Sequence, residues 1–284
     1  MLLDGMGGRK HYPVFIVGSP RSGTTLLYQL LARETKAAYV SNFVSRFWGS
    51  PVVGAHLYDL VYHEDSKIPL TSRVGRTPGP HSPHEFAWFW QYWCDWPDVD
   101  DVSTDVLEAF PWERIRREIR GLSQYFGSPL VLKSLNYTNY QIDWLSETFP
   151  NAKFLWIRRD PLFTVQSMFK VRKRVQPDPH KWWSIRPSDY TNYLGQSLLN
   201  QVCHQYNDII NTIRESFVQL ENRKKHTVTY ESLTENTIEE IWNISRFVGV
   251  DCSVGDIDGS VVSNRNRKII DETYFEKMKS LLDV

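Results

Sequence analysis

The sequence predicts an α/β fold, in which a P-loop-type parallel sheet is flanked by helices. Short apolar runs of strand length alternate along the chain with segments of helical pattern, as is typical of parallel sheets covered by helices. The first apolar run also ends in a glycine-framed loop. At 284 residues with 41% hydrophobic residues, the chain is long enough for a full core, and no repeat or linker divides it. We therefore expect one domain over residues 1–284.

The first strand is expected at residues 13–18, PVFIVG, a continuous apolar run that ends in a glycine. The helix formers TTLLYQLLARET follow immediately. Between them, GSPRSGTT at residues 18–25 has the G-x-x-x-x-G frame of a phosphate-binding loop. Thr24 stands where ATP and GTP enzymes with such a loop have a lysine.

The same strand-and-helix order continues further along the chain. Strands are expected at residues 129–134, 152–157 and 225–230, and helices at residues 139–149, 161–171 and 239–250. Because the carboxyl ends of parallel strands meet at one edge of a sheet, we expect the ligand to bind at that edge.

Two long segments interrupt this order. About ninety residues between the first two strand units have little strand pattern, and residues 172–188 combine three prolines with basic and aromatic residues. We interpret both as largely helical insertions that form the acceptor pocket. Their tryptophans either line that pocket or pack in the core; these residues are Trp88, Trp90, Trp93, Trp96, Trp182 and Trp183.

Composition limits the partners and the compartment. Lysine plus arginine and aspartate plus glutamate both number 33, so no global charge favours nucleic acid. The three cysteines have no C-x-x-C spacing, which argues against a disulfide framework and a metal cluster. The first residues do not resemble a signal peptide, and no apolar run approaches the roughly 18 to 20 residues of a membrane span. We expect a cytoplasmic protein without a membrane span.

The loop at residues 18–25 is suited to an anion. Backbone N–H groups and the amino end of the following helix form an anion cradle, and Arg21 lies inside the loop where it can bind an oxyanion bidentately. Without the lysine, the loop suits one phosphate and no metal. The alternative is a glycine turn that binds nothing.

A second motif is IRRDPLFTVQS. Arg159 ends a predicted strand and Ser167 lies two turns into the next helix, so both can reach one group above the sheet. This pair suits a second phosphate, which points to a bisphosphorylated nucleotide. Alternatively, Asp160 and Pro161 only start the helix and Arg159 is a solvated charge.

The two motifs together resemble the sulfotransferase family, which transfers a sulfuryl group from 3′-phosphoadenosine 5′-phosphosulfate (PAPS). The similar segments are FIVGSPRSGTTLLYQLL, LVLKSLNYTNYQIDWLSETFPNAKFLWIRRDPLFTVQS and TVTYESLTENTIEEIWNISRFVGV. The chain looks closest to the broad branch that includes bacterial, carbohydrate and protein-tyrosine sulfotransferases. The resemblance implies PAPS as co-substrate, adenosine 3′,5′-bisphosphate as product, no metal, and a small-molecule or glycan hydroxyl as acceptor.

The resemblance also implies roles in nucleotide binding. The loop that holds the 5′-phosphosulfate matches Arg21, Ser22, Gly23, Thr24 and Thr25, and the 3′-phosphate pair matches Arg159 and Ser167. Tyr230 matches a residue that lies against the adenine. Arg265 and Arg267 fall where the family closes a C-terminal segment over the 3′-phosphate; a solvated basic loop is the alternative for these two.

Lys133 matches a family lysine near the reacting centre, where an ammonium can offset charge on the leaving group. The alternative is a lysine that reaches solvent from a strand end. A proline and a histidine commonly follow this lysine in the family, whereas Leu135, Asn136 and Tyr137 stand here.

The base that takes the acceptor's proton is expected in the first insertion. Glu85 is the leading candidate, followed by His84 and His81. Alternatively, Ser82 and Glu85 form a helix capping box, in which Glu85 bonds only the backbone.

Two other functions remain open. A P-loop kinase or NTPase requires a loop lysine and an acidic residue at a strand end for Mg²⁺, and the sequence has Thr24 and the basic run RRD in those places. A non-catalytic nucleotide-binding protein of the same fold is the other alternative.

Overall fold

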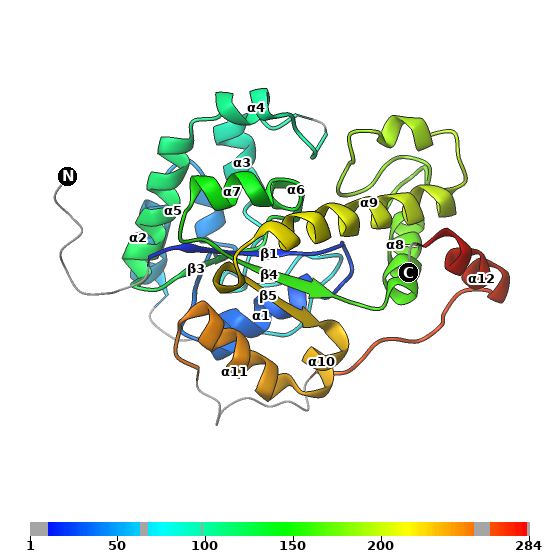
Figure 1. Ribbon diagram of the computed structural model, residues 1–284. Coiled ribbons are helices and arrows are strands. Elements are labelled where there is room, and N and C mark those ends of the chain that lie inside the picture. Colours follow the sequence, from blue (N-terminus) through cyan, green and yellow to red (C-terminus); the bar gives the residue numbers. More distant parts are fainter. Residues whose placement is uncertain (1–10, 63–67, 98, 253–261, 283–284) are drawn as a thin grey trace.

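The computed structural model describes residues 11–62, 68–97, 99–252 and 262–282 (Figure 1). Its centre is a five-stranded sheet in the order β2-β3-β1-β4-β5, in which every strand pair is parallel. The strands are β1 (Pro13–Val17), β2 (Ala38–Tyr39), β3 (Leu130–Leu132), β4 (Lys153–Arg158) and β5 (Lys225–Thr229). The predicted α/β fold with a helix-flanked parallel sheet is confirmed.

The central strand β1 is buried on both faces because both faces are covered by helices. Phe15 and Val17 belong to one hydrophobic core, whereas Val14 and Ile16 belong to the other. On the first face Phe15 stacks on Phe154 of β4, with 5.5 Å between ring centroids. The continuous apolar run in the sequence thus supplies side chains to two cores at once.

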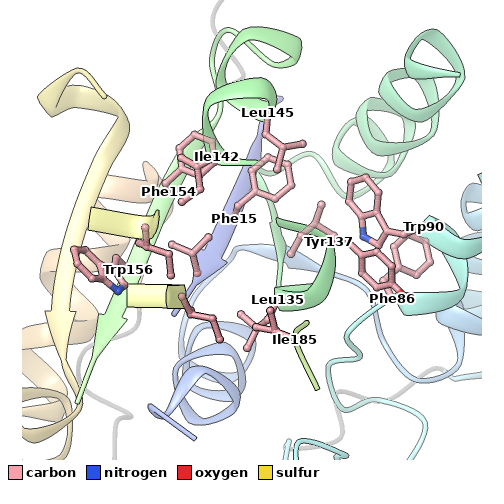
Figure 2. Packing of buried hydrophobic residues seen from close by; sticks show 14 of the residues in the cluster. Phe15, Phe86, Trp90, Leu135, Tyr137, Ile142, Leu145, Phe154, Trp156 and Ile185 are labelled. Atoms are coloured by element: carbon pink, nitrogen blue, oxygen red, sulfur yellow. The ribbon is translucent and has the colours of Figure 1, made fainter. Parts of the chain in front are cut away.

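Helices cover the two faces separately (Figure 1). One face carries α1 (Thr24–Glu34), α10 (Tyr230–Glu235) and α11 (Thr237–Val248), and the other carries α5 (Trp112–Phe126), α7 (Ile142–Thr148) and α9 (Leu198–Gln219). Figure 2 shows Ile142 and Leu145 of α7 directed toward Phe15 and Phe154. This packing holds the strands in register, so that the loops after them share one edge.

The remaining elements lie beyond this central layer. They are η1 (Val44–Phe47), α2 (Pro51–Val61), α3 (Ala87–Cys94), α4 (Thr104–Ala109), α6 (Leu135–Thr138), α8 (Pro161–Val175), η2 (Tyr190–Tyr193), η3 (Asn222–Lys224) and α12 (Glu272–Leu281). No helix in the described ranges is both long and apolar enough to cross a membrane.

Three elements differ from the sequence prediction. Helix α9, with 22 residues, was not predicted, although Val202, Ile209 and Ile213 recur at helical spacing on its buried side. The helix expected at residues 139–149 begins later, as α7 at Ile142, and the short helix α6 before it was not predicted. Helix α8 extends to Val175, so the first basic residues of the second insertion are helical.

Candidate functional site

The loop between β1 and α1 is bent by backbone conformations that favour glycine. Gly23, at the amino end of α1, has φ 103°, and a Cβ there would lie 2.8 Å from Cδ2 of Tyr230. Arg21 also has a positive φ, 72°. The glycine frame therefore lets the loop approach the residues that follow β5.

A buried asparagine holds the start of this loop. The Gly18 N–H donates to Oδ1 of Asn139 at 3.2 Å, and Nδ2 of Asn139 donates back to the Gly18 carbonyl at 2.9 Å. Asn139 lies 121 residues away in the sequence and follows α6. Sequence reasoning missed this residue, because nothing in the local pattern distinguishes it from a solvated turn residue.

The amino end of α1 has N–H groups available for an anion. The first N–H groups of a helix have no acceptor within the helix, and Gly23 supplies no side-chain cap. Thr25 is half-buried beside them, whereas Thr24 is buried. The Ser22 hydroxyl is buried and donates to the Ser19 carbonyl at 2.8 Å, so it braces the loop rather than facing outward.

The two sequence motifs meet at this helix end. Nε of Arg21 donates to Oγ of Ser167 at 3.1 Å, and Nη1 of Arg159 donates to the Arg21 carbonyl at 3.0 Å. Burial lowers the pKa of Arg21, and the nearby charges of Arg159, Arg174 and Arg265 lower it further. The four arginines therefore form a cluster of positive charge that suits anionic oxygens.

Arg174 was not predicted as part of this cluster. It lies seven residues after Ser167 on α8, which is two helical turns and hence the same side of the helix. The unexpected extension of α8 is what brings Arg174 into the cluster.

Tyr230 lies under Arg159. The centre of the Arg159 guanidinium is 4.4 Å from the Tyr230 ring centroid, which is cation–π distance. The Tyr230 ring also packs against Gly23, and the residue is only 4% exposed. Tyr230 thus supports both the loop and Arg159.

The C-terminal segment before α12 crosses this site. The Arg265 N–H donates to the Tyr230 hydroxyl at 3.0 Å, and Nε of Arg159 donates to Oδ1 of Asn266 at 2.8 Å. The Arg267 carbonyl accepts from Nε2 of Gln166 at 2.9 Å, while its side chain is exposed. The segment is therefore anchored over the site by its backbone rather than lying free in solvent.

These elements enclose a cavity of about 290 Å³. Its lining includes Arg21, Gly23, Thr24, Thr25, Arg159, Tyr230 and Arg265. Of the residues predicted for nucleotide binding, Ser22, Ser167 and Arg267 do not line this cavity. Ser167 is nevertheless joined to it through Arg21.

Lys133 and Glu85 form an ion pair beside the same loop. Lys133 follows β3 and is buried, and the Ser134 hydroxyl donates to the Glu85 carbonyl at 2.7 Å. A Cβ on Gly75 would lie 2.9 Å from Oε1 of Glu85 and 4.0 Å from Oγ1 of Thr25. The pair is thus close to the amino end of α1, and the alternative in which Lys133 reaches solvent is wrong.

The capping-box alternative for Glu85 is also wrong. Helix α3 begins at Ala87, with Phe86 at its N-cap position in a left-handed conformation of φ 57°. Ser82 and Glu85 therefore both precede the helix. The carboxylate of Glu85 pairs with Lys133 rather than with the backbone N–H of Ser82.

His84 is adjacent to this pair. Its Nδ1 accepts the Phe86 N–H at 2.9 Å. Burial lowers the pKa of His84, the Lys133 and Arg76 charges lower it further, and Glu85 opposes them. A neutral imidazole is therefore favoured, with its Nδ1 already occupied.

His84 and Glu85 line a second cavity, of about 1020 Å³. Trp88 lines it as well and is exposed, whereas Trp90 and Trp96 are buried in the core (Figure 2 labels Trp90). Trp182 is buried too. The tryptophans of the two insertions thus divide between the cavity wall and the core.

Comparison with known proteins identifies the family to which this sequence is similar. A sequence model of the sulfotransferase family matches residues 13–253. No curated protein matches the chain.

Solved structures share the fold at low sequence identity. Sulfotransferase STF1 from Mycobacterium tuberculosis H37Rv aligns with a TM-score of 0.56 and 14% identity, covering 96% of this chain and 76% of that one. Sulfotransferase STF9 from Mycobacterium avium aligns with a TM-score of 0.51 and 13% identity, covering 95% of this chain and 67% of that one. The family match extends from β1 to beyond α11 and includes the loop between β1 and α1, the Lys133–Glu85 pair and the Arg159 motif, so the chain belongs to the sulfotransferase family.

Proposed function

We propose that the chain uses PAPS to sulfate a hydroxyl group of a small-molecule or glycan acceptor, giving a sulfate ester and adenosine 3′,5′-bisphosphate. The observation that carries the proposal is the meeting of two anion-binding groups with an acid–base pair at one sheet edge. Arg21 and Arg159 lie at the amino end of α1, and the Lys133–Glu85 pair lies beside Thr25.

The loop suits the 5′-phosphosulfate. The first N–H groups of α1 have no acceptor within the helix and no side-chain cap, and the helix dipole also favours an anion at this end. Ser22 keeps the loop in this shape through its bond to Ser19.

The arginine cluster suits the 3′-phosphate. Arg159 is held between the Tyr230 ring and Asn266, and Ser167 orients Arg21. Arg265 adds charge from the C-terminal segment. We assign Tyr230 to the wall of the nucleotide site, because it lines the cavity beside Arg159. Arg267 contributes its backbone carbonyl, which anchors the segment.

The Lys133–Glu85 pair suits the transfer step. The Glu85 carboxylate accepts the proton of the acceptor hydroxyl as the new S–O bond forms. The S–O bond to the 5′-phosphate breaks at the same time, and the Lys133 ammonium offsets the negative charge that develops on that phosphate oxygen. His84 is the second candidate for the base, although its Nδ1 is engaged by Phe86.

The kinase alternative is less well supported by the same residues. Thr24 occupies the position of the loop lysine, and it is buried. The acidic residue after β4, Asp160, uses Oδ1 to accept the N–H groups of Leu162 and Phe163 at the start of α8. Its carboxylate is therefore a helix cap rather than a group directed toward a phosphate.

We also propose that residues 1–284 form one sulfotransferase domain that works in the cytoplasm. All three cysteines are free thiols, which supports a reducing compartment.

A ligand titration followed by a turnover assay tests the proposed function. We expect adenosine 3′,5′-bisphosphate to raise the melting temperature without metal, and ATP with Mg²⁺ to raise it less. Incubation with PAPS and a panel of alcohols, phenols and sugars is then expected to give a sulfate ester, detected by mass spectrometry. Stabilisation by ATP with Mg²⁺ alone would contradict the proposal. Binding of the bisphosphate without turnover on any acceptor would favour the non-catalytic alternative.

A further inference from the structure

The lining of the cavity beside Glu85 has more positive than negative side chains. Its lining includes two arginines, Arg46 and Arg76, and one carboxylate, that of Glu85. Glu85 is already paired with Lys133. The described lining of the cavity therefore has two uncompensated positive charges.

Arg76 lies close to the reacting centre. It follows Gly75, which approaches the Glu85 carboxylate, and its charge reaches His84, whose pKa it lowers. Its backbone bonds to Arg73 in both directions, at 2.9 and 3.1 Å, so its position is fixed. Its guanidinium is exposed and has no hydrogen-bond or ion-pair partner among the described residues.

Arg46 comes from a different part of the chain. It lies in η1, between Phe43 and Trp48, which also line the cavity. Its guanidinium is exposed and likewise has no partner within the described ranges. Two separate segments thus each present an unpaired guanidinium to one cavity.

Aromatic side chains form much of the remaining wall. The exposed residues Trp48 and Trp88 both line the cavity, and the Tyr92 ring lies 4.4 Å from the Trp48 ring centroid. Helix α2 begins three residues after Trp48 and exposes four apolar side chains at helical spacing; these are Val53, Leu57, Leu60 and Val61. The cavity wall thus has exposed aromatic surface next to the two arginines.

We propose that the acceptor is an amphiphile: a hydroxyl compound that has an apolar body and an anionic group. Its hydroxyl lies at Glu85, its apolar body packs on Trp48 and Trp88, and its carboxylate, phosphate or sulfate binds Arg46 and Arg76. Guanidinium groups bind such oxyanions bidentately, and tryptophan faces bind apolar chains and rings. This inference rests on the proposed function and adds the class of acceptor to it.

Matched acceptors test the contribution of the anionic group separately from that of the apolar body. We would measure kcat and KM with PAPS for ω-hydroxydodecanoate, its methyl ester, ω-aminododecanol and glycolate, each below any aggregation threshold. The carboxylate is expected to give a kcat/KM about 10-fold or more above the ester, by the strength of one charge-assisted hydrogen bond. The amine and glycolate, which lack the anion and the apolar body respectively, are expected to be poorer than the carboxylate.

Variants connect this preference to the two arginines. Arg46→Gln and Arg76→Gln are each expected to raise KM for ω-hydroxydodecanoate about 10-fold, and to leave KM for the ester within about twofold. Arg116→Gln is the matched control, because Arg116 is an exposed arginine on α5 that lines a different cavity. It is expected to change neither value.

The outcomes distinguish this inference from the proposed function. Stabilisation by adenosine 3′,5′-bisphosphate together with equal use of the carboxylate and the ester would overturn the inference and leave the proposed function standing. Failure of the bisphosphate to bind would overturn the proposed function. In that case, calorimetric binding of ω-hydroxydodecanoate over its ester, lost in Arg46→Gln, would still support the anionic site, and absence of that preference would overturn it.

Discussion

Lys133 and Glu85 form an ion pair although they lie 48 residues apart in the sequence. The Lys133 side chain is 3% exposed, whereas that of Glu85 is 44% exposed. One member of the pair is therefore fixed inside the protein, and the other faces the larger cavity. The buried Lys133 ammonium therefore lies next to the Glu85 carboxylate, which an incoming hydroxyl can reach.

Glu85→Gln is expected to lower kcat about 100- to 10,000-fold, because an amide cannot take the acceptor's proton. The amide oxygen can still accept from Lys133, so the loop geometry is retained. Binding of adenosine 3′,5′-bisphosphate, measured by calorimetry, is expected to be unchanged. Turnover at the wild-type rate would exclude Glu85 as the base and leave His84 as the candidate.

Lys133→Met is expected to lower kcat roughly 100- to 1,000-fold, as loss of a group that stabilises transition-state charge does. Methionine fills a similar buried volume, and the half-exposed Glu85 stays hydrated, so we expect a folded protein. Stopped-flow or single-turnover assays with PAPS measure the effect on the chemical step. An unchanged single-turnover rate would contradict a role for Lys133 in that step.

Arg159→Met is expected to remove the preference for a 3′-phosphate. Wild-type protein should bind adenosine 3′,5′-bisphosphate about 10- to 100-fold more tightly than adenosine 5′-monophosphate, as a charge-assisted bond provides. The variant should bind both alike. Arg158→Met is the control, because Arg158 is the neighbouring residue but is exposed and lies over Trp156. Equal effects of the two substitutions would contradict the assignment.

Gly23→Ala is expected to abolish nucleotide binding. The new Cβ would lie 2.8 Å from Tyr230, and the backbone has φ 103°, so the loop must shift or the helix end must move. Gly195→Ala is the control, because a Cβ at Gly195 meets nothing within 4 Å. Thermal-shift titration with adenosine 3′,5′-bisphosphate measures both. A normal titration of Gly23→Ala would show that the loop does not bind the nucleotide.

The stability of the fold is expected to fall in mild acid because of His226. Burial lowers the pKa of His226, and its Nε2 is buried without a partner in the described structure. A lowered pKa in the folded state means that the neutral form is favoured by folding. This stabilisation is present above the unfolded pKa of about 6.5 and is lost as the pH falls through the lower folded pKa.

Urea unfolding at several pH values measures this dependence. His226→Gln is expected to flatten the decrease in unfolding free energy below about pH 6.5. His180→Gln is the control, because His180 is exposed. A wild-type slope in His226→Gln would assign the acid sensitivity to other groups, including His84, whose pKa is lowered as well.

Local features of the sequence were sufficient for much of the fold. Apolar runs predicted β1, β3 and β4, because a strand buried on both faces needs a continuous apolar run. The strand expected at residues 225–230 is β5, an edge strand with one buried residue. The two-residue strand β2 was missed, since it is too short to have a pattern. The position of Arg159 and Ser167 on one strand–helix unit was also predictable, because their spacing within that unit is set by local geometry.

The sequence by itself determined the parallel sheet, the glycine-framed loop and the basic motif after β4, because each depends on residues that are neighbours in the chain. Only the tertiary structure decided that Glu85 pairs with Lys133, that Asn139 holds Gly18 and that Arg174 joins the arginine cluster. It also decided that Trp88 faces a cavity while Trp90 lies in the core. These contacts join segments that are distant in the chain, and their partners are selected by the packing of whole helices against the sheet rather than by any local pattern.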